Sequence, residues 1–516
     1  MSSAKVIGRN LAFNWFSQGA NLIVMFFLSP FVIHTLGLEA YGLWGVLNVL
    51  TGYMGVLDLG VRASTGRHIV LYLGKGDKQA VDQTIRTSLG FFTTISFVFI
   101  AAGFVLGWAF PTLFTNVSQQ FYPLMPILMP VMALNVWFGT YSSVMSSVII
   151  AHDRFDLARS VDLVVLAFRT VGTIFVLKSG YGLLGLAAVA VSCNVLSLFG
   201  NWLLANRLYS NLRVWPLLLD RLRLKELFSY GIAAAISTAS IKIMGQTDLI
   251  IVVAMIGDTE TGIYSAGASL LYYSSTFLGQ IRTTFFPPVQ RAVANGEMGQ
   301  AKWLFFRQIH LSMFVTIPIF VGFICFGKQF LSLWIYDPIL FPAEAIISAA
   351  AVMGVLAASK LLLLFTSSAQ SLLAAMGYIG YTAKISVLEA VVNVLFSVVF
   401  VVTGWGLVGV AMGTLMGRFL VRTFPMSYLA CKVAGISWVK LVKSIFLKLC
   451  LVGFLFAAIC FGIQYFLPSN SWLMFAVQVV LSLLLYLFIA FPVLVPPADK
   501  LKIFNFAKSK LCECED

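Results

Sequence analysis

The sequence predicts an all-α polytopic membrane protein with about 14 transmembrane helices: two parallel six-helix lobes around a central cavity, plus two extra C-terminal helices. Three observations support this fold class. Hydrophobic residues make up 60% of the 516-residue chain and charged residues only 10%, which is too little charge to cover the surface of a soluble protein of this size. The chain also contains fourteen long apolar stretches, and its two halves repeat each other.

Each apolar stretch is long enough for a helix that crosses the hydrocarbon core of a bilayer, which takes about 20 residues. The connections between the stretches are short and leave no room for a soluble catalytic domain. The predicted spans are residues 11–33, 41–61, 87–110, 122–150, 158–177, 182–206, 227–255, 262–281, 304–326, 343–375, 379–402, 405–428, 444–466 and 472–495.

Two glycine patterns establish the repeat. HTLGLEAYGLW at 34–44 aligns without a gap with AMIGDTETGIY at 254–264, an offset of 220 residues. KSGYGLLGLA at 178–187 aligns with VTGWGLVGVA at 402–411, an offset of 224 residues. The second pattern has the letters of a dinucleotide-binding fingerprint, but it lies between two apolar spans and follows no strand. We therefore interpret it as a tight turn between helices.

The repeat unit holds six spans, and an even number preserves orientation, so the two lobes should be parallel. The sequence predicts an N-terminal lobe at 1–206, a cytoplasmic linker at 207–226 and a C-terminal lobe at 227–432. Residues 433–516 hold the two extra spans and a basic cytoplasmic tail.

The distribution of basic residues predicts the orientation of the chain. With the N-terminus in the cytoplasm, 28 Lys and Arg residues fall on the cytoplasmic side and two, Lys178 and Lys328, on the other. This bias follows the positive-inside rule and places both termini in the cytoplasm, in a multi-pass protein of the cytoplasmic (inner) membrane. The net charge of +14 is thus explained by topology and by contact with membrane lipids, and no nucleic-acid partner is expected.

Six ionisable residues lie well inside the predicted spans, where each costs roughly 2.5–3.5 kcal/mol on insertion scales. They are Asp162, Arg169, Lys242, Asp248, Lys360 and Glu389. Asp162 and Arg169 share a helix face, which favours an internal ion pair that fixes packing. The two lysines have no acidic residue one turn away, which favours a role in a cavity. A polar stripe of Asn14, Gln18 and Asn21 on the first span supports a polar interior.

Central lysines and an arginine favour an anionic substrate, because ammonium and guanidinium groups bind phosphate oxygens through charge-assisted hydrogen bonds. Asp248 and Glu389 are alternative candidates for coupling to H⁺ or Na⁺. Nothing in the sequence indicates a cofactor, a metal site or ATP hydrolysis.

Four segments carry a family resemblance: LGLEAYGLW (36–44), VLDLGVRASTGRHIVLYLGKGDKQA (56–80), TDLIIVVAMIGDTETGIYSAG (247–267) and FFPPVQRAVANGE (285–297). In these segments the chain resembles the polysaccharide-biosynthesis exporters, the lipid-linked oligosaccharide flippases of the multidrug/oligosaccharidyl-lipid/polysaccharide superfamily. The resemblance implies two six-helix lobes around a cationic cavity, and alternating access that moves a polyprenyl-diphosphate-linked glycan to the outer leaflet. It also implies family positions at Asp58, Arg62 and Asp248.

The sequence therefore predicts a flippase and not an enzyme. The expected partners are a lipid-linked anionic glycan, membrane lipids and a polysaccharide polymerase or glycosyltransferases. The alternative is a cation-coupled multidrug exporter of the same fold, which would depend on its carboxylates and tolerate loss of its lysines. The candidate substrate-binding residues are Lys242, Lys360, Arg169, Asn14, Gln18, Asn21, Arg62 and Arg282, and the candidates for ion coupling are Asp248, Glu389 and Asp58.

Overall fold

A computed structural model describes the backbone of residues 3–55, 60–209, 212–468, 471–495 and 500. Within these ranges the side chains of residues 3–12, 14, 15, 230–245, 273, 276, 277, 280 and 283 are outside the description.

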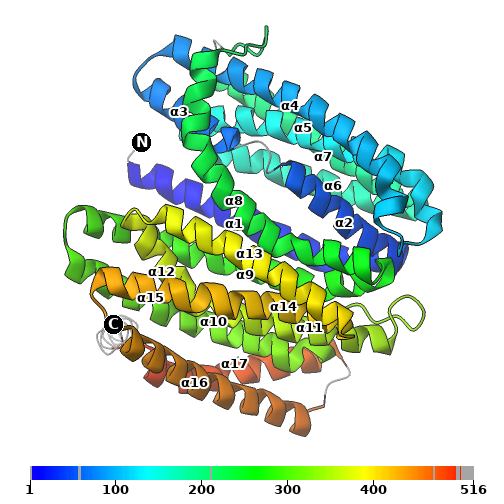
Figure 1. Ribbon diagram of the computed structural model, residues 1–516, viewed down its shortest axis with the longest axis vertical. Helices are drawn as coiled ribbons and strands as arrows, with labels where there is room; N and C mark the ends of the chain where they lie inside the picture. Colours follow the sequence, from blue (N-terminus) through cyan, green and yellow to red (C-terminus); the bar gives the residue numbers. More distant parts are fainter. Residues whose placement is uncertain (1–2, 56–59, 210–211, 469–470, 496–499, 501–516) are drawn as a thin grey trace, which may run out of the picture. The chain divides into compact units, whose positions relative to one another are not determined.

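The described chain is helical, and its only β feature is an isolated bridge between Asp337 and Phe341. Figure 1 shows the order of the helices. Their bounds are α1 Ser3–Leu36, α2 Leu38–Met54, α3 Val61–Gly74, α4 Lys78–Leu113, η1 Gln119–Leu124, α5 Met125–Ala151, α6 Phe155–Lys178, α7 Gly182–Leu208, α8 Arg221–Met255, α9 Asp258–Ala294, α10 Met298–Trp334, α11 Ala343–Leu361, α12 Leu363–Ala375, α13 Ile379–Val402, α14 Gly406–Gly417, η2 Arg418–Thr423, α15 Phe424–Ala434, α16 Trp438–Phe466 and α17 Trp472–Leu494.

The all-helical membrane fold is confirmed. Every predicted span overlaps at least one described helix, and eleven of the described helices are long and apolar enough to cross a membrane. The total of fourteen spans stays a prediction. Predicted span 343–375 divides at Leu362 into α11 and α12, and predicted span 405–428 contains the π-helical turn η2.

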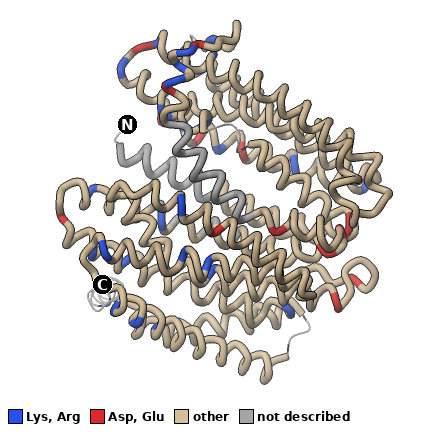
Figure 2. The backbone as a smooth tube through the Cα atoms, viewed as in Figure 1, with Lys and Arg blue, Asp and Glu red and all other residues tan. Residues whose placement is uncertain are grey.

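The exposed surface of the helices is also apolar, as expected for helices that contact lipid. Figure 2 shows long stretches of helix without a basic or acidic residue. Large apolar side chains point outward from these stretches, among them Trp108 at 82% exposed and Phe488 at 84% exposed. Because apolar surface of this extent is unfavourable in water, these faces indicate contact with hydrocarbon.

The helices group into two compact units, residues 1–262 and 263–516. In unit 1, α4, α5 and α7 pack side by side, and α8 packs on α2 and α3. In unit 2, α13 packs on α14, and α10 packs on α11 and α16. The boundary between the units falls at Gly262, in the first turns of α9, whereas the predicted C-terminal lobe begins at residue 227, within α8. The division into lobes from the repeat therefore stays a prediction.

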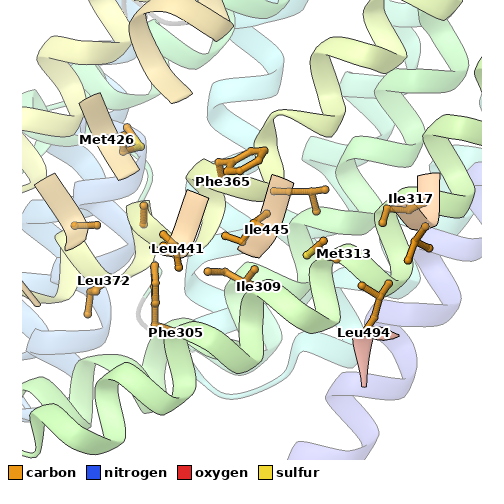
Figure 3. Close-up of a cluster of buried hydrophobic side chains, with 14 of the residues drawn as sticks. Phe305, Ile309, Met313, Ile317, Phe365, Leu372, Met426, Leu441, Ile445 and Leu494 are labelled. Atoms are coloured by element: carbon orange, nitrogen blue, oxygen red, sulfur yellow. The ribbon is translucent and has the colours of Figure 1, made fainter. Parts of the chain in front are cut away.

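Unit 2 has a large apolar core, built around one face of α10. Figure 3 shows Phe305, Ile309, Met313 and Ile317 along this face, spaced by four residues as a helical stripe requires. They pack against side chains from four other helices, namely Phe365 and Leu372 of α12, Met426 of α15, Leu441 and Ile445 of α16, and Leu494 of α17.

The glycine turns of the repeat have matching backbones in the two units. Gly180 and Gly404 have φ values of 79° and 88°, and Gly182 and Gly406 have φ values of 50° and 53°. These left-handed conformations are accessible to glycine at little cost, which explains why the two turns carry glycine at the same places. The interpretation of this motif as a helix–helix turn is confirmed.

Candidate functional site

A buried carboxylate and two buried guanidinium groups form an ion network inside unit 2. Glu389 lies on α13, and its side chain is 3% exposed. Its Oε1 accepts from Nε of Arg418 at 3.4 Å, and its Oε2 accepts from Nη1 of Arg422 at 3.1 Å. Both arginines belong to η2, a π-helical turn of a kind often found at functional sites.

The network extends to three more helices. Nη1 of Arg418 donates to Oγ and to the backbone oxygen of Ser359 on α11, at 3.0 Å and 3.2 Å. Nη2 of Arg422 donates to Oε1 of Gln370 on α12 at 3.2 Å. The same Gln370 oxygen accepts from Nη1 of Arg282 on α9 at 2.8 Å. Two guanidinium groups thus pair with Glu389, and a third, that of Arg282, is linked to them through Gln370.

Small residues allow α14 to approach α13 closely enough for this contact. A Cβ at Gly413 would lie 2.1 Å from Oγ of Ser397, and a Cβ at Gly417 would lie 3.1 Å from the backbone nitrogen of Asn393. Nδ2 of Asn393 donates to Oγ1 of Thr414 at 2.6 Å and joins the same two helices. Arg418 follows Gly417 directly, so the close approach places its guanidinium beside Glu389.

The segment of sequence that holds most of this network contains few acidic residues. Between residues 345 and 434 the sequence has one acidic residue, Glu389, and five basic residues, Lys360, Lys384, Arg418, Arg422 and Lys432. Arg418 and Arg422 with Glu389, and Arg282 through Gln370, place several guanidinium donors close together. Because guanidinium groups bind phosphate and carboxylate oxygens through charge-assisted hydrogen bonds, this arrangement favours an anionic ligand.

In unit 1, two predicted site residues meet. Nη2 of Arg169 on α6 donates to Oδ1 of Asn21 on α1 at 3.0 Å. The predicted ion pair between Asp162 and Arg169 is wrong, because Asp162 pairs with Arg159 at 2.7 Å. Asp162 and Arg169 are seven residues apart, which separates them by about 10 Å along the axis, whereas Arg159 is less than one turn away.

Unit 1 also joins its helices with neutral polar contacts. Nδ2 of Asn194 on α7 donates to Oδ1 of Asn135 on α5 at 2.6 Å. One turn further along α7, Ser197 shares a hydrogen bond with Ser142 at 2.8 Å, and Asn201 donates to Ser142 at 3.1 Å. These contacts bury no net charge.

The remaining predicted residues lie in different surroundings. Asp248 on α8 is buried next to Thr247, whose hydroxyl is 2.9 Å from that of Tyr53. Lys360 is half-buried at the end of α11, directly after Ser359. Gln18 on α1 and Arg62 on α3 are exposed. The side chains of Asn14 and Lys242 and the whole of Asp58 lie outside the described residues, so their roles, like those of Asp248 and Glu389 in ion coupling, stay predictions.

Sequence reasoning missed Arg418, Arg422 and Gln370. The two arginines were assigned to the cytoplasmic side with the other basic residues, although both fall inside the predicted span 405–428. Two arginines four residues apart within an apolar span share one helix face, and this spacing could have identified them.

Comparison with known proteins identifies the family. The model of a family described as polysaccharide biosynthesis protein matches residues 72–336, which is just over half of the chain. The chain belongs to the polysaccharide biosynthesis protein family. The chain is also similar in sequence to a curated protein, with 22% identity over 262 residues. That protein is the probable low-salt glycan biosynthesis flippase Agl15 of Haloferax volcanii. That match covers 51% of this chain and 53% of the relative, so the chain spans about half the length of the curated protein it matches.

Solved structures show that this family member has the fold of the multidrug/oligosaccharidyl-lipid/polysaccharide superfamily. An inward-facing multidrug-resistance transporter of the MATE family matches with a TM-score of 0.68 and 15% identity, over 81% of this chain and 96% of that one. The lipid II flippase MurJ in an inward closed conformation also matches with a TM-score of 0.68 and 15% identity, over 93% and 97% of the two chains. At this identity the likeness shows the fold alone, and the resemblance inferred from the sequence motifs is confirmed.

Proposed function

We propose that this protein is a flippase that moves a polyprenyl-diphosphate-linked oligosaccharide from the inner to the outer leaflet of the cytoplasmic membrane by alternating access. The observation that carries the proposal is the group of three linked arginines in unit 2, in which Arg418 and Arg422 pair with Glu389 and Arg282 meets Arg422 at Gln370. A diphosphate is the part of such a substrate that guanidinium groups bind best, through paired charge-assisted hydrogen bonds.

The same fold serves transporters of different substrates, so the charge of the site decides between them. A multidrug exporter that carries organic cations would need carboxylates facing its substrate. Among the described residues of unit 2 the buried carboxylate is Glu389, and it is paired with two arginines. This pairing favours an anionic substrate over the alternative of a cation-coupled exporter.

In unit 2, Arg282, Arg422 and Lys360 would bind the diphosphate. The roles of Arg169, Asn21, Lys242 and Asn14 in substrate binding stay predictions from the sequence. The polyprenyl tail would remain in the hydrocarbon, where burial of each CH₂ contributes about 0.8 kcal/mol. Transport moves the substrate without changing its covalent bonds, so no catalytic residue is assigned.

The test compares two substrates in the same proteoliposomes. Purified protein is reconstituted with polyprenyl-diphosphate N-acetylglucosamine, and the sugar that becomes accessible to an impermeant lectin is measured over time. Uptake of ethidium is measured in parallel, with and without a pH or Na⁺ gradient. We expect the protein to increase exposure of the sugar and to leave ethidium uptake unchanged. Ethidium transport without movement of the lipid-linked sugar would contradict the proposal and favour the exporter.

A further inference from the structure

Gln370 occupies an unusual place in the arginine network of unit 2. Its single amide oxygen, Oε1, accepts from Nη1 of Arg282 at 2.8 Å and from Nη2 of Arg422 at 3.2 Å. The two donors come from helices far apart in the sequence, α9 and the η2 turn, and converge on one neutral atom. Guanidinium groups bind carboxylate and phosphate oxygens more strongly than neutral amides, because the acceptor's charge compensates their own.

The arginine on the η2 side is fixed in place by Glu389. Nη1 of Arg422 donates to this carboxylate while Nη2 of the same group reaches Gln370. Arg418 holds the other carboxylate oxygen and is itself held by Ser359 on α11. Glu389 and Arg418 therefore act as positioning residues, which orient Arg422 with one edge toward Gln370.

The helix that carries Gln370 is anchored in the apolar core, but Gln370 itself is only half-buried. Phe365, Ala369 and Leu372 of α12 are buried in the apolar core, and Figure 3 shows Phe365 and Leu372 among its side chains. Gln370 and Arg282 are half-buried. A glutamine side chain can leave this position by rotation about its own bonds, without movement of the helix.

We propose that Arg282 and Arg422 form a clamp for a phosphate group, and that the Gln370 amide oxygen occupies the position of a phosphate oxygen until an anion displaces it. The ligand class is a diphosphate ester or a free diphosphate, which share the charged oxygens that the two guanidinium groups would bind. This inference rests on the proposed function for the identity of the ester as a lipid-linked glycan. It adds to the site Gln370 and the residues that position Arg422, namely Glu389 and Arg418.

The decisive variant is Gln370→Glu, which keeps the shape of the side chain and places a fixed carboxylate between the two arginines. We expect Gln370→Glu to raise the unfolding temperature of the purified full-length protein in the absence of ligand, because the two guanidinium groups gain an internal anion. The same variant should lose affinity for a diphosphate by about tenfold or more, because the carboxylate competes with the ligand. Gln370→Leu should show the opposite pattern, with a lower unfolding temperature and a larger stabilisation by ligand.

Binding is measured by thermal unfolding at constant ionic strength with two probes, inorganic pyrophosphate and geranylgeranyl diphosphate. Arg282→Gln should weaken both about tenfold or more, whereas the matched control Lys384→Gln, which removes an exposed charge from α13, should weaken neither. Tighter binding of the prenyl probe than of pyrophosphate would identify a lipid-linked ligand, and equal binding would identify a free diphosphate. Both results support the clamp.

The clamp is refuted if wild type and Gln370→Glu are stabilised equally by both probes, and this result would leave the proposed function standing if the lipid-linked sugar still moves in proteoliposomes. It is also refuted if neither probe stabilises the wild type. Failure of the proposed function is separate, because a protein that binds pyrophosphate through Arg282 but does not move the lipid-linked sugar would retain the clamp and lose the flippase assignment.

Discussion

The two units join corresponding helices at the same positions of the repeat, but with different chemistry. In unit 1, Nδ2 of Asn194 donates to the side-chain and backbone oxygens of Asn135, at 2.6 Å and 3.4 Å. In unit 2 the residues 224 positions later are Arg418 and Ser359, and Nη1 of Arg418 donates to the side-chain and backbone oxygens of Ser359, at 3.0 Å and 3.2 Å. The pattern of donors and acceptors is the same in the two units. The donor is a neutral amide in unit 1 and a charged guanidinium group in unit 2.

Two neighbouring positions differ in the same direction, whereas Arg169 of unit 1 corresponds to the neutral Asn393 of unit 2. Val165 in unit 1 corresponds to Glu389 in unit 2 at the same offset, and Leu198 corresponds to Arg422. Unit 1 shows that apolar and neutral residues suffice at the four positions that correspond to Ser359, Glu389, Arg418 and Arg422. Because each buried charge raises the free energy of the folded protein in the membrane, the charges of unit 2 are not explained by packing. Their presence indicates a function at these positions of unit 2 that the corresponding positions of unit 1 lack.

The largest expected effect tests this difference directly. A triple variant, Glu389→Leu with Arg418→Met and Arg422→Met, removes all three charges and replaces them with apolar side chains of similar size. Such replacements are often neutral or even stabilising, by about 1–4 kcal/mol. We therefore expect a folded protein whose unfolding temperature is close to that of the wild type. Transport of the lipid-linked sugar should fall by roughly 10–100-fold, because at least one charged hydrogen bond to the substrate is lost.

This variant separates packing from function. Its stability is measured by thermal unfolding in detergent and its activity by the lectin assay in proteoliposomes. Transport at the wild-type rate would mean that the charges of unit 2 have no role in transport and that the comparison with unit 1 has no functional meaning.

A single substitution in the same network should have a large effect on stability. Glu389→Gln leaves Arg418 and Arg422 buried without their carboxylate, which we expect to lower the free energy of unfolding by about 3–5 kcal/mol. The control is Asn393→Ala, one turn along α13, which removes a neutral hydrogen bond to Thr414 and should cost about 1 kcal/mol. The unfolding temperatures of both variants are compared, and a smaller loss for Glu389→Gln than for Asn393→Ala would show that the carboxylate does not compensate the arginines.

The sequence revealed local features of the fold and missed contacts between distant segments. The glycine turns were predictable, because a left-handed backbone at Gly180 and Gly404 is a property of the residue itself. Glu389 was identified as a charge inside an apolar span. Its partners were not, because they lie 29 and 33 residues away, on the far side of a turn, and reach it only through close packing at Gly413 and Gly417.

The error at Asp162 has a related cause. Helical periodicity placed Asp162 and Arg169 on one face, but periodicity alone does not account for the rise along the helix axis or for neighbouring helices. Arg159 was nearer to Asp162, and Asn21 of α1 was available to Arg169. Position on a helix face is thus predictable from the sequence, whereas the choice of partner depends on the packing of several helices.

The smallest expected effects test whether the two turns of the repeat are energetically equivalent. Gly180→Ala and Gly404→Ala each place a Cβ on a residue with positive φ, and neither Cβ would meet another atom within 4 Å. Backbone strain is then the main cost, and we expect each substitution to lower the free energy of unfolding by about 1–2 kcal/mol.

The control is Gly322→Ala within α10, which also meets no atom within 4 Å. There the higher helix propensity of alanine should leave stability unchanged or raise it slightly. Thermal unfolding of the three variants should therefore show two equal losses and no loss in the control. Unequal losses at Gly180 and Gly404 would mean that the two turns contribute differently to the free energy of unfolding, although their backbones have the same conformation.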